Sequence, residues 1–364
     1  MNPVPAQALI SSAAAQFSQQ LVSSDGVMNL YLHAPGGAIE VSGGGLGSQT
    51  IQSVPITGQD QDYIRSIASR LDSIIDLDFV FVGEAVQADT AFYYDQEIDL
   101  GESGNGQTLG LSISGSAGWE LFVNYPLVAD NWDYRQYVNV HEWGHSLGLE
   151  HPFEAGDGDL YDNNTDPWTS AFPEQTVMAY RSPESGDWPD FFTTSDLNAL
   201  IEIWGAETRL LGSEADQFAG ADYRDVVIGA GGNDVLLGAA GFDSLQGGWG
   251  DDELLGGKGA DALMGGNGND ILKAGHGHDT LKGGAGDDLM RGGYGGDLFL
   301  LSAGNDVIED FRLSENDRLG IPVGVSVSLA QVGNDLHVST DQGTTFLWNL
   351  SIENFNVAER LINV

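Results

Sequence analysis

The residues best suited to chemistry lie within eleven positions, 141–151, which read HEWGHSLGLEH. His141 and His145 are four residues apart, so a helix would place both imidazoles on one face, about one turn apart. Two imidazoles in that arrangement can bind one metal ion. Glu142 lies beside that face, where its carboxylate can reach a metal-bound water without being a ligand itself. We therefore expect a catalytic metal site in which Glu142 is the general base.

Gly148 and His151 complete the pattern. Gly148 permits the sharp turn that ends the helix, and the returning chain can then offer His151 as a third ligand. Three protein ligands leave one coordination position open, which is typical of catalytic rather than structural zinc. The full spacing H-E-x-x-H-x-x-G-x-x-H is a specific signal. Two other interpretations stay open here: a helix that carries histidines for other reasons, and a zinc site that cleaves nothing.

This string resembles the metzincin zinc peptidases, and Pro152 after the third histidine is similar to their serralysin branch. Residues 176–180, TVMAY, resemble the Met-turn of that branch. The resemblance implies that Met178 packs beneath the zinc histidines as a structural residue. It also implies that Tyr180 binds zinc at rest, then swings away and donates a hydrogen bond to the oxyanion. Residues 193–205 are similar to the helix that ends serralysin catalytic domains.

Apolar periodicity predicts the elements that must position these residues. Helices are predicted over 59–75, 133–147 and 195–204, the last with Ser195 or Thr194 as its N-cap. Strands are predicted over 79–82, 91–94 and 119–125. The strand at 119–125 could pair with an extended substrate backbone or simply belong to the core. The mixture predicts an α+β domain, and the resemblance implies that this domain is a metzincin-like peptidase.

A nine-residue repeat begins at Gly220 and runs nine times without a gap. Its first, second and fourth positions are mostly glycine, its sixth is always Asp and its eighth is always apolar. Each unit predicts a turn followed by a short strand whose middle residue is buried only when units stack. Carboxylate and carbonyl oxygens in such turns suit Ca²⁺. The predicted calcium ligands are Asp225, Asp234, Asp243, Asp252, Asp261, Asp270, Asp279, Asp288 and Asp297.

The repeat resembles the calcium-binding nonapeptide of RTX proteins. The resemblance implies an all-β parallel β-roll whose successive turns lie on alternate sides, with each ion between repeats n and n+2. Nine repeats allow four plus three such sites, and because the first and third repeats lack glycines we expect about four to seven structural Ca²⁺ ions. The alternative is a Gly-rich flexible linker, which has no reason to keep Asp and apolar residues in register. Strands that close the roll are predicted at 307–308, 336–338 and 346–348.

These patterns divide the 364 residues into three parts. We expect a leader or propeptide over 1–20, a metzincin-like catalytic domain over 21–208, and an RTX β-roll domain with a C-terminal secretion region over 209–364. The tail FNVAERLINV resembles the uncleaved signal of type I secretion, although a terminal strand would read the same. A further acidic loop, 156–166, either binds a structural Ca²⁺ or is solvated; its carboxylates are Asp157, Asp159, Asp162 and Asp166.

Composition restricts the partners and the compartment. Thirteen Lys and Arg against 54 Asp and Glu give a net charge of −41, which should repel nucleic acid and anionic membranes. The absence of cysteine removes disulfides and thiolate chemistry. We expect no membrane span, because apolar runs fall well short of about 18 residues.

With the two resemblances, these features predict a secreted, extracellular, monomeric zinc endopeptidase. It would act on protein or peptide substrates and be exported by type I secretion machinery. The alternatives are a non-catalytic calcium-binding RTX surface or adhesion protein, and a zinc hydrolase of another substrate class.

Overall fold

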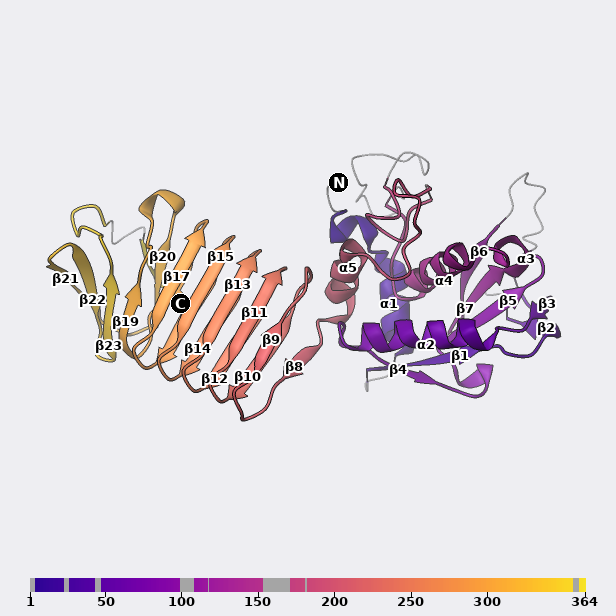
Figure 1. The fold of residues 1–364 in the computed structure, drawn as a ribbon, viewed down its shortest axis with the longest axis horizontal. Coiled ribbons are helices and arrows are strands. Elements are labelled where there is room, and N and C mark those ends of the chain that lie inside the picture. The colour runs from indigo at the N-terminus through magenta and orange to yellow at the C-terminus, as the bar shows by residue number, and fades with distance from the viewer. Residues whose placement is uncertain are drawn as a thin grey trace. The chain divides into compact units, whose positions relative to one another are not determined.

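The computed structural model describes residues 4–22, 26–42, 47–98, 108–116, 118–152, 171–180, 182–355 and 360–364. Contacts divide the chain into two units, Met1–Glu207 and Thr208–Val364 (Figure 1). The acidic loop at 156–166, expected either to bind Ca²⁺ or to be solvated, lies outside the described residues. Among those residues, no helix is both long and apolar enough to cross a membrane.

A mixed seven-stranded sheet forms the base of unit 1. Its strands are β1 (Val27–Leu32), β2 (Gly37–Val41), β3 (Gln49–Val54), β4 (Asp78–Phe81), β5 (Thr90–Asp95), β6 (Gly110–Gly115) and β7 (Gly118–Asn124). β1, β4, β5 and β7 are mutually parallel, whereas β6 runs antiparallel to β7. The three strands predicted in this unit are confirmed as β4, β5 and β7.

The position of β7 distinguishes between two expectations. β7 pairs with β5 along one side and with β6 along the other, so neither of its edges is open to a substrate. Of the two alternatives for the strand at 119–125, the structure therefore supports the core strand and not pairing with a peptide. Within the described residues, β6 is the outer strand on this side of the sheet.

Within the described residues, unit 1 also contains five α-helices, α1 (Ser12–Leu21), α2 (Gly58–Asp72), α3 (Tyr125–Val128), α4 (Trp132–Ser146) and α5 (Thr194–Trp204), with 3-10 turns at Ala6–Leu9 and Ala85–Gln87. The three predicted helices are confirmed as α2, α4 and α5. The N-cap of α5 is Thr193, not Ser195 or Thr194. Its side chain accepts a hydrogen bond from the Asp196 N–H while the Asp196 carboxylate accepts one from the Thr193 N–H, a reciprocal pair that fixes the helix start.

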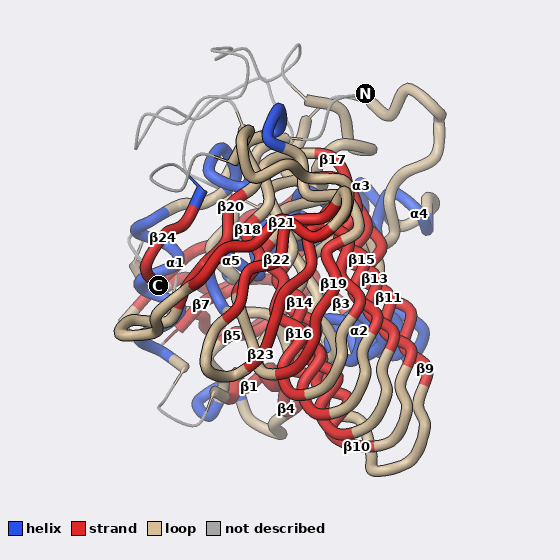
Figure 2. Tube along the Cα trace, turned by 90° about the vertical axis from the view of Figure 1, so that its left-hand side faces the viewer, coloured by secondary structure: helices blue, strands red, loops and turns tan. Residues whose placement is uncertain are grey.

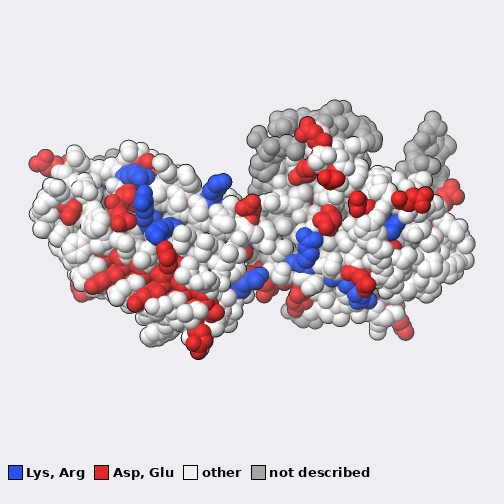
Figure 3. Space-filling model, in the orientation of Figure 1, with Lys and Arg blue, Asp and Glu red and all other residues white. Residues whose placement is uncertain are grey.

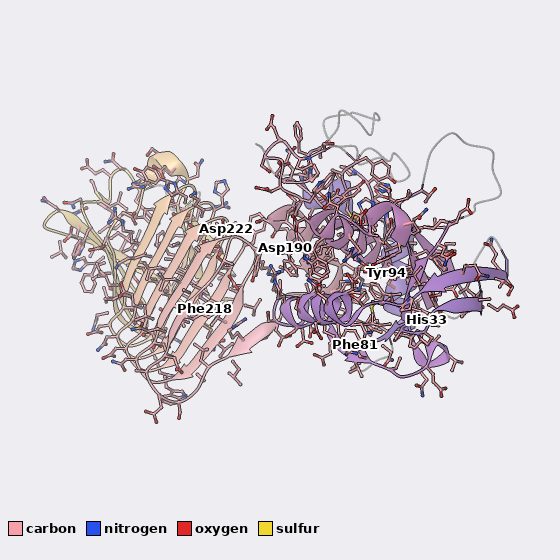
Figure 4. The ribbon with its side chains drawn as sticks, turned by 45° about the vertical axis from the view of Figure 1, so that its right-hand side comes forward. His33, Phe81, Tyr94, Asp190, Phe218 and Asp222 are labelled. Carbon is pink, nitrogen blue, oxygen red and sulfur yellow. The ribbon has the colours of Figure 1, made fainter. Side chains whose placement is uncertain are left out.

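α4, which carries the predicted histidines, is buried along most of its length. The Trp143 ring lies edge-on to Phe79 and Phe92, with ring centroids 5.6 and 5.3 Å apart. Deeper in the unit, the Asn139 amide donates to the hydroxyl of Tyr94, which Figure 4 labels. Contacts on several sides give this helix little freedom to move.

Unit 2 is a parallel β-roll built from two facing sheets (Figures 1 and 2). One sheet contains β8 (Thr208–Leu210), β10 (Val226–Gly231), β12 (Ser244–Trp249), β14 (Ala262–Asn267), β16 (Thr280–Ala285), β18 (Leu298–Leu300), β20 (Arg318–Ile321) and β24 (Leu361–Asn363). The other contains β9 (Gln217–Ala219), β11 (Val235–Ala240), β13 (Glu253–Lys258), β15 (Ile271–His276), β17 (Leu289–Tyr294), β19 (Gly304–Ile308), β21 (Ser328–Val332), β22 (Asp335–Ser339) and β23 (Gly343–Leu347).

Successive nonapeptides alternate between these sheets, so each repeat pairs with the one 18 residues away, as Leu254 does with Leu272. All nine eighth-position residues are buried between the sheets, at 0–2% exposure. The roll and its alternation are therefore confirmed. The strands predicted beyond residue 300 are confirmed as β19, β22 and β23. Phe218 and Asp222, labelled in Figure 4, lie in the first turns. On the face that Figure 3 shows, acidic side chains form a band along one edge of this unit.

Candidate metal centre

His141, His145 and His151 converge in unit 1. One ring nitrogen from each lies within 4.8 Å of the others. The Nε2 atoms of His141 and His151 are 3.2 Å apart. Two nitrogens bound to one tetrahedral zinc at about 2.05 Å would be about 3.3 Å apart. The spacing of the imidazoles therefore fits a shared zinc ion.

The outer nitrogens of two of these rings are already bonded. His141 Nδ1 lies 2.7 Å from the Val177 carbonyl oxygen, and His145 Nδ1 lies 3.0 Å from that of Leu149. Each bond holds a proton on Nδ1 and leaves the Nε2 lone pair for a metal. Burial, reinforced by the two neighbouring imidazoles, holds the pKa of His141 well below its usual range. The ring is thus neutral, as a metal ligand must be.

Glu142 is buried beside the histidines. Burial raises the pKa of its carboxyl to about 7, although a hydrogen bond from Ser112 opposes the rise. The Ser112 hydroxyl on β6 lies 2.7 Å from Glu142 Oε2. Gly110, also on β6, leaves room for this side chain, since a Cβ there would lie 2.3 Å from Glu142 Oε1. A carboxyl with this pKa can exchange protons near neutral pH.

The turn that contains Met178 packs against α4 at Gly144. Met178 is completely buried, and a Cβ on Gly144 would lie 2.7 Å from its sulfur, so Gly144 allows the close approach. The Asp196 carboxylate accepts from the Val177 N–H at 2.9 Å, and the Val177 carbonyl in turn accepts from His141. Asp196 at the start of α5 therefore fixes the turn that orients the first histidine. Sequence patterns gave no signal for this link.

Tyr180 lies at the rim of the site. Its ring centroid is 4.5 Å from that of His151 and 5.6 Å from that of His141, and the residue is 43% exposed. It is thus close to the ligands while retaining room to turn toward solvent.

Two hollows flank the centre. One, of about 340 Å³, is lined by the aromatic residues Tyr134 and Tyr137 of α4 and by Trp188, which precedes α5. The other, of about 310 Å³, contains His145, His151 and the N-terminal residues Ser11 and Ala14 in its wall. Both include Gly110 and Glu142. The arrangement offers space on both sides of the Glu142 carboxylate.

In the roll, the repeat aspartates form two ladders. For example, the Asp234 N–H donates to Asp252 Oδ1 at 2.8 Å. The second oxygen, Oδ2, is buried and lacks any hydrogen-bond partner in eight of the nine: Asp234, Asp243, Asp252, Asp261, Asp270, Asp279, Asp288 and Asp297. Buried carboxylate oxygens without a partner are costly, and they fit a hard cation that binds oxygen. In the ninth, Asp225, this oxygen accepts from the Ala221 N–H at 3.0 Å.

The ladders extend beyond the predicted set. Asp306 and Asp317 are buried and accept at Oδ1 from Asp288 and Asp297, at 3.3 and 2.9 Å. Their Oδ2 atoms accept from the Ser302 hydroxyl and the Arg312 N–H instead of lacking a partner. Asp306 could have been found, because it continues the sixth position of the repeat nine residues after Asp297. The leading glycines are missing from that unit.

Comparison with known proteins identifies the repeats. A family model described as RTX calcium-binding nonapeptide repeat (4 copies) matches residues 212–245, 246–281 and 274–308. Serralysin B of Dickeya chrysanthemi is 29% identical over 102 residues, which are 26% of this chain and 21% of that protein. The chain thus matches about a fifth of this relative's length. The extracellular lipase LipA of Serratia marcescens superposes with a TM-score of 0.24 at 18% identity, over 43% of this chain and 40% of that one. The chain therefore carries RTX calcium-binding repeats.

Proposed function

We propose that the protein is a secreted zinc endopeptidase of the serralysin type, a metzincin that hydrolyses peptide bonds in proteins. The observation that carries this proposal is the convergence of three imidazoles beside a buried carboxylate with hollows on both sides. The partial similarity to Serralysin B supports it. Met1–Glu207 would hold the peptidase and Thr208–Val364 the calcium-stabilised roll with its secretion region.

His141, His145 and His151 would hold the zinc through their Nε2 atoms. When bound, zinc supplies a Lewis acid that polarises the scissile carbonyl and lowers the pKa of a coordinated water toward ~7. Glu142 takes the proton of the attacking water and later passes it to the leaving amine. Ser112 keeps the carboxylate turned toward the site.

Tyr180 would stabilise the developing oxyanion. Its position beside His141 and His151 also suits a ligand in the resting site, and its exposure gives it room to turn. A donor of this kind contributes about 3–4 kcal/mol to transition-state stabilisation in other hydrolases. A peptide would lie antiparallel along β6, whose residues Gly110 to Ser112 line the hollows.

Calcium would act on the second unit. Each buried Oδ2 of the ladders would face Ca²⁺, and the expectation of four to seven ions remains a prediction. Ion binding supplies folding energy that disulfides supply in other secreted proteins. Because calcium is plentiful outside cells, the roll would fold after export through type I secretion machinery, and the mature protein would be an extracellular monomer.

The test compares hydrolysis of casein by the wild type and by Glu142→Ala, each with its bound zinc measured. We expect equal zinc content and a loss of at least 100-fold in rate for the variant, because general base catalysis contributes about 10²–10⁴. Glu84→Ala, which removes an exposed carboxylate elsewhere in unit 1, is the control. If the zinc-loaded wild type hydrolyses no faster than the variant, the proposal fails, and a non-catalytic calcium-binding surface protein becomes the better account.

A further inference from the structure

The N-terminal segment, residues 4–22, is bound to the loop that presents His151. The Leu9 carbonyl accepts from the Glu150 N–H at 2.8 Å, and the Ser11 N–H donates to the Gly148 carbonyl at 2.9 Å. Between them, Ile10 and Leu149 form an antiparallel bridge. These pairings cover residues 148–150, three of the four residues that connect the end of α4 to His151.

α1 packs against the turn at Gly148. Gly148 has a φ of +103°, and a Cβ on it would lie 2.8 Å from the Cα of Ala15, so the helix backbone is in close contact with the turn. One helical turn further on, the Ser18 hydroxyl lies 2.7 Å from the Ser146 carbonyl and accepts from the Trp119 indole N–H at 2.9 Å. Ser18 is completely buried.

The segment is also fastened to α5. The Val4 N–H donates to the Ser195 hydroxyl at 3.0 Å, and the Gln19 amide donates to the Ile203 carbonyl at 2.6 Å. Val4 and Leu9 are 2% and 0% exposed, so both ends of the segment's first half are part of the core. Every one of these contacts lies within unit 1.

We infer that residues 4–22 form a wall of the metal centre and that α1 positions His151. His141 and His145 are held by the rigid α4, but His151 follows that helix on a loop, which needs support from elsewhere. Groups behind a metal ligand typically change metal affinity by about 10–100-fold. Removal of residues 1–20, over which a leader or propeptide is expected, would strip the His151 loop of its backbone partners. The assignment of zinc rests on the proposed function.

The test uses two leucine substitutions in α1 of the full-length, calcium-loaded protein. Ala15→Leu places a large side chain against the Gly148 turn, whereas Ala13→Leu adds the same side chain on the exposed face of the helix. Zinc affinity is measured by competition with a chromophoric chelator, and the visible spectrum of the cobalt-substituted site reports its geometry. We expect Kd to rise about 10-fold or more in Ala15→Leu, with an altered cobalt spectrum, and to stay unchanged in Ala13→Leu.

A second, smaller substitution keeps the test valid if Ala15→Leu fails to fold. Ser18→Ala removes only one hydroxyl, and we expect it to weaken zinc binding in the same direction while the calcium-dependent spectrum of the roll is unchanged. Wild-type zinc affinity and cobalt spectrum in both Ala15→Leu and Ser18→Ala would overturn the inference. If the wild type binds no zinc, the proposed function fails. The inference is then decided by hydrogen exchange at residues 148–151 of the metal-free protein, which must be faster in Ser18→Ala than in the wild type.

Discussion

We expect the metal-free roll to be folded at low pH and to need Ca²⁺ for folding at neutral pH. Burial raises the pKa of several ladder carboxyls far above the ordinary value of 3.8, with neighbouring aspartates as a further cause. The pKa is about 7 for Asp243, Asp270, Asp279 and Asp288. The perturbation is removal of Ca²⁺ followed by a change of pH. Metal-free protein is prepared by passage over a chelating resin, because soluble chelators weaken in acid.

The sign follows from proton binding. Between pH 4 and 7 these carboxyls hold their protons in the folded roll but lose them in the unfolded chain. The folded state then binds more protons, and its stability falls as pH rises through this window. A rise of three pKa units corresponds to about 4 kcal/mol per group, which solvent screening reduces to about 2 kcal/mol. Because neighbouring aspartates are one cause of these raised pKa values, the four contributions are not additive, but even one is a sizeable part of the roughly 5–15 kcal/mol that stabilises a whole domain.

The assay is hydrogen exchange by mass spectrometry on peptides from residues 226–300, with rates corrected for the intrinsic effect of pH. We expect protection in the metal-free protein at pH 4.5, loss of protection by pH 7.5, and recovery at pH 7.5 when Ca²⁺ is added. Asp270→Asn, which cannot ionise, should extend protection to higher pH, whereas Asp222→Asn on the exposed surface should not. Protection that increases with pH in the absence of calcium would refute the reasoning.

Three further predictions concern single contacts. Ser112→Ala should lower kcat about 10-fold with little change in KM, because the hydroxyl orients Glu142 and not the substrate. Ser112→Thr should restore most of the lost kcat. A kcat in Ser112→Ala equal to that of the wild type would contradict this role of the hydroxyl. Gly144→Ala should destabilise unit 1 by about 1–3 kcal/mol, because its Cβ meets the Met178 sulfur; an unchanged Tm for that unit would speak against the packing. Leu272→Ala should lower the stability of the calcium-loaded roll by about 2–5 kcal/mol in denaturant titrations, and a change below 1 kcal/mol would be inconsistent with its complete burial.

The sequence determined those features that depend on spacing along one element. A four-residue interval on a helix puts His141 and His145 on one face whatever surrounds them. A nine-residue period likewise brings every sixth-position Asp and every eighth-position side chain into register, because each turn of the roll stacks on an identical one. Local geometry thus sufficed to predict the helix that carries His141 and His145 and the register of the nine repeat aspartates, of which the structure leaves eight with a partnerless oxygen. The two sheets of the roll were implied by the resemblance to RTX proteins.

Only the tertiary structure decided which distant segments meet. β7 was predicted from its apolar run whereas β6 was not, and only the order of the two strands in the sheet determines which one lies at the edge. Ser112 reaches Glu142, Asp196 reaches Val177, and Leu9 pairs with Glu150 across 30, 19 and 141 residues. The ladders end where Ser302 and Arg312 donate to the last carboxylates. No periodicity marks such contacts, because each depends on how whole elements compete to bury their surfaces against one another.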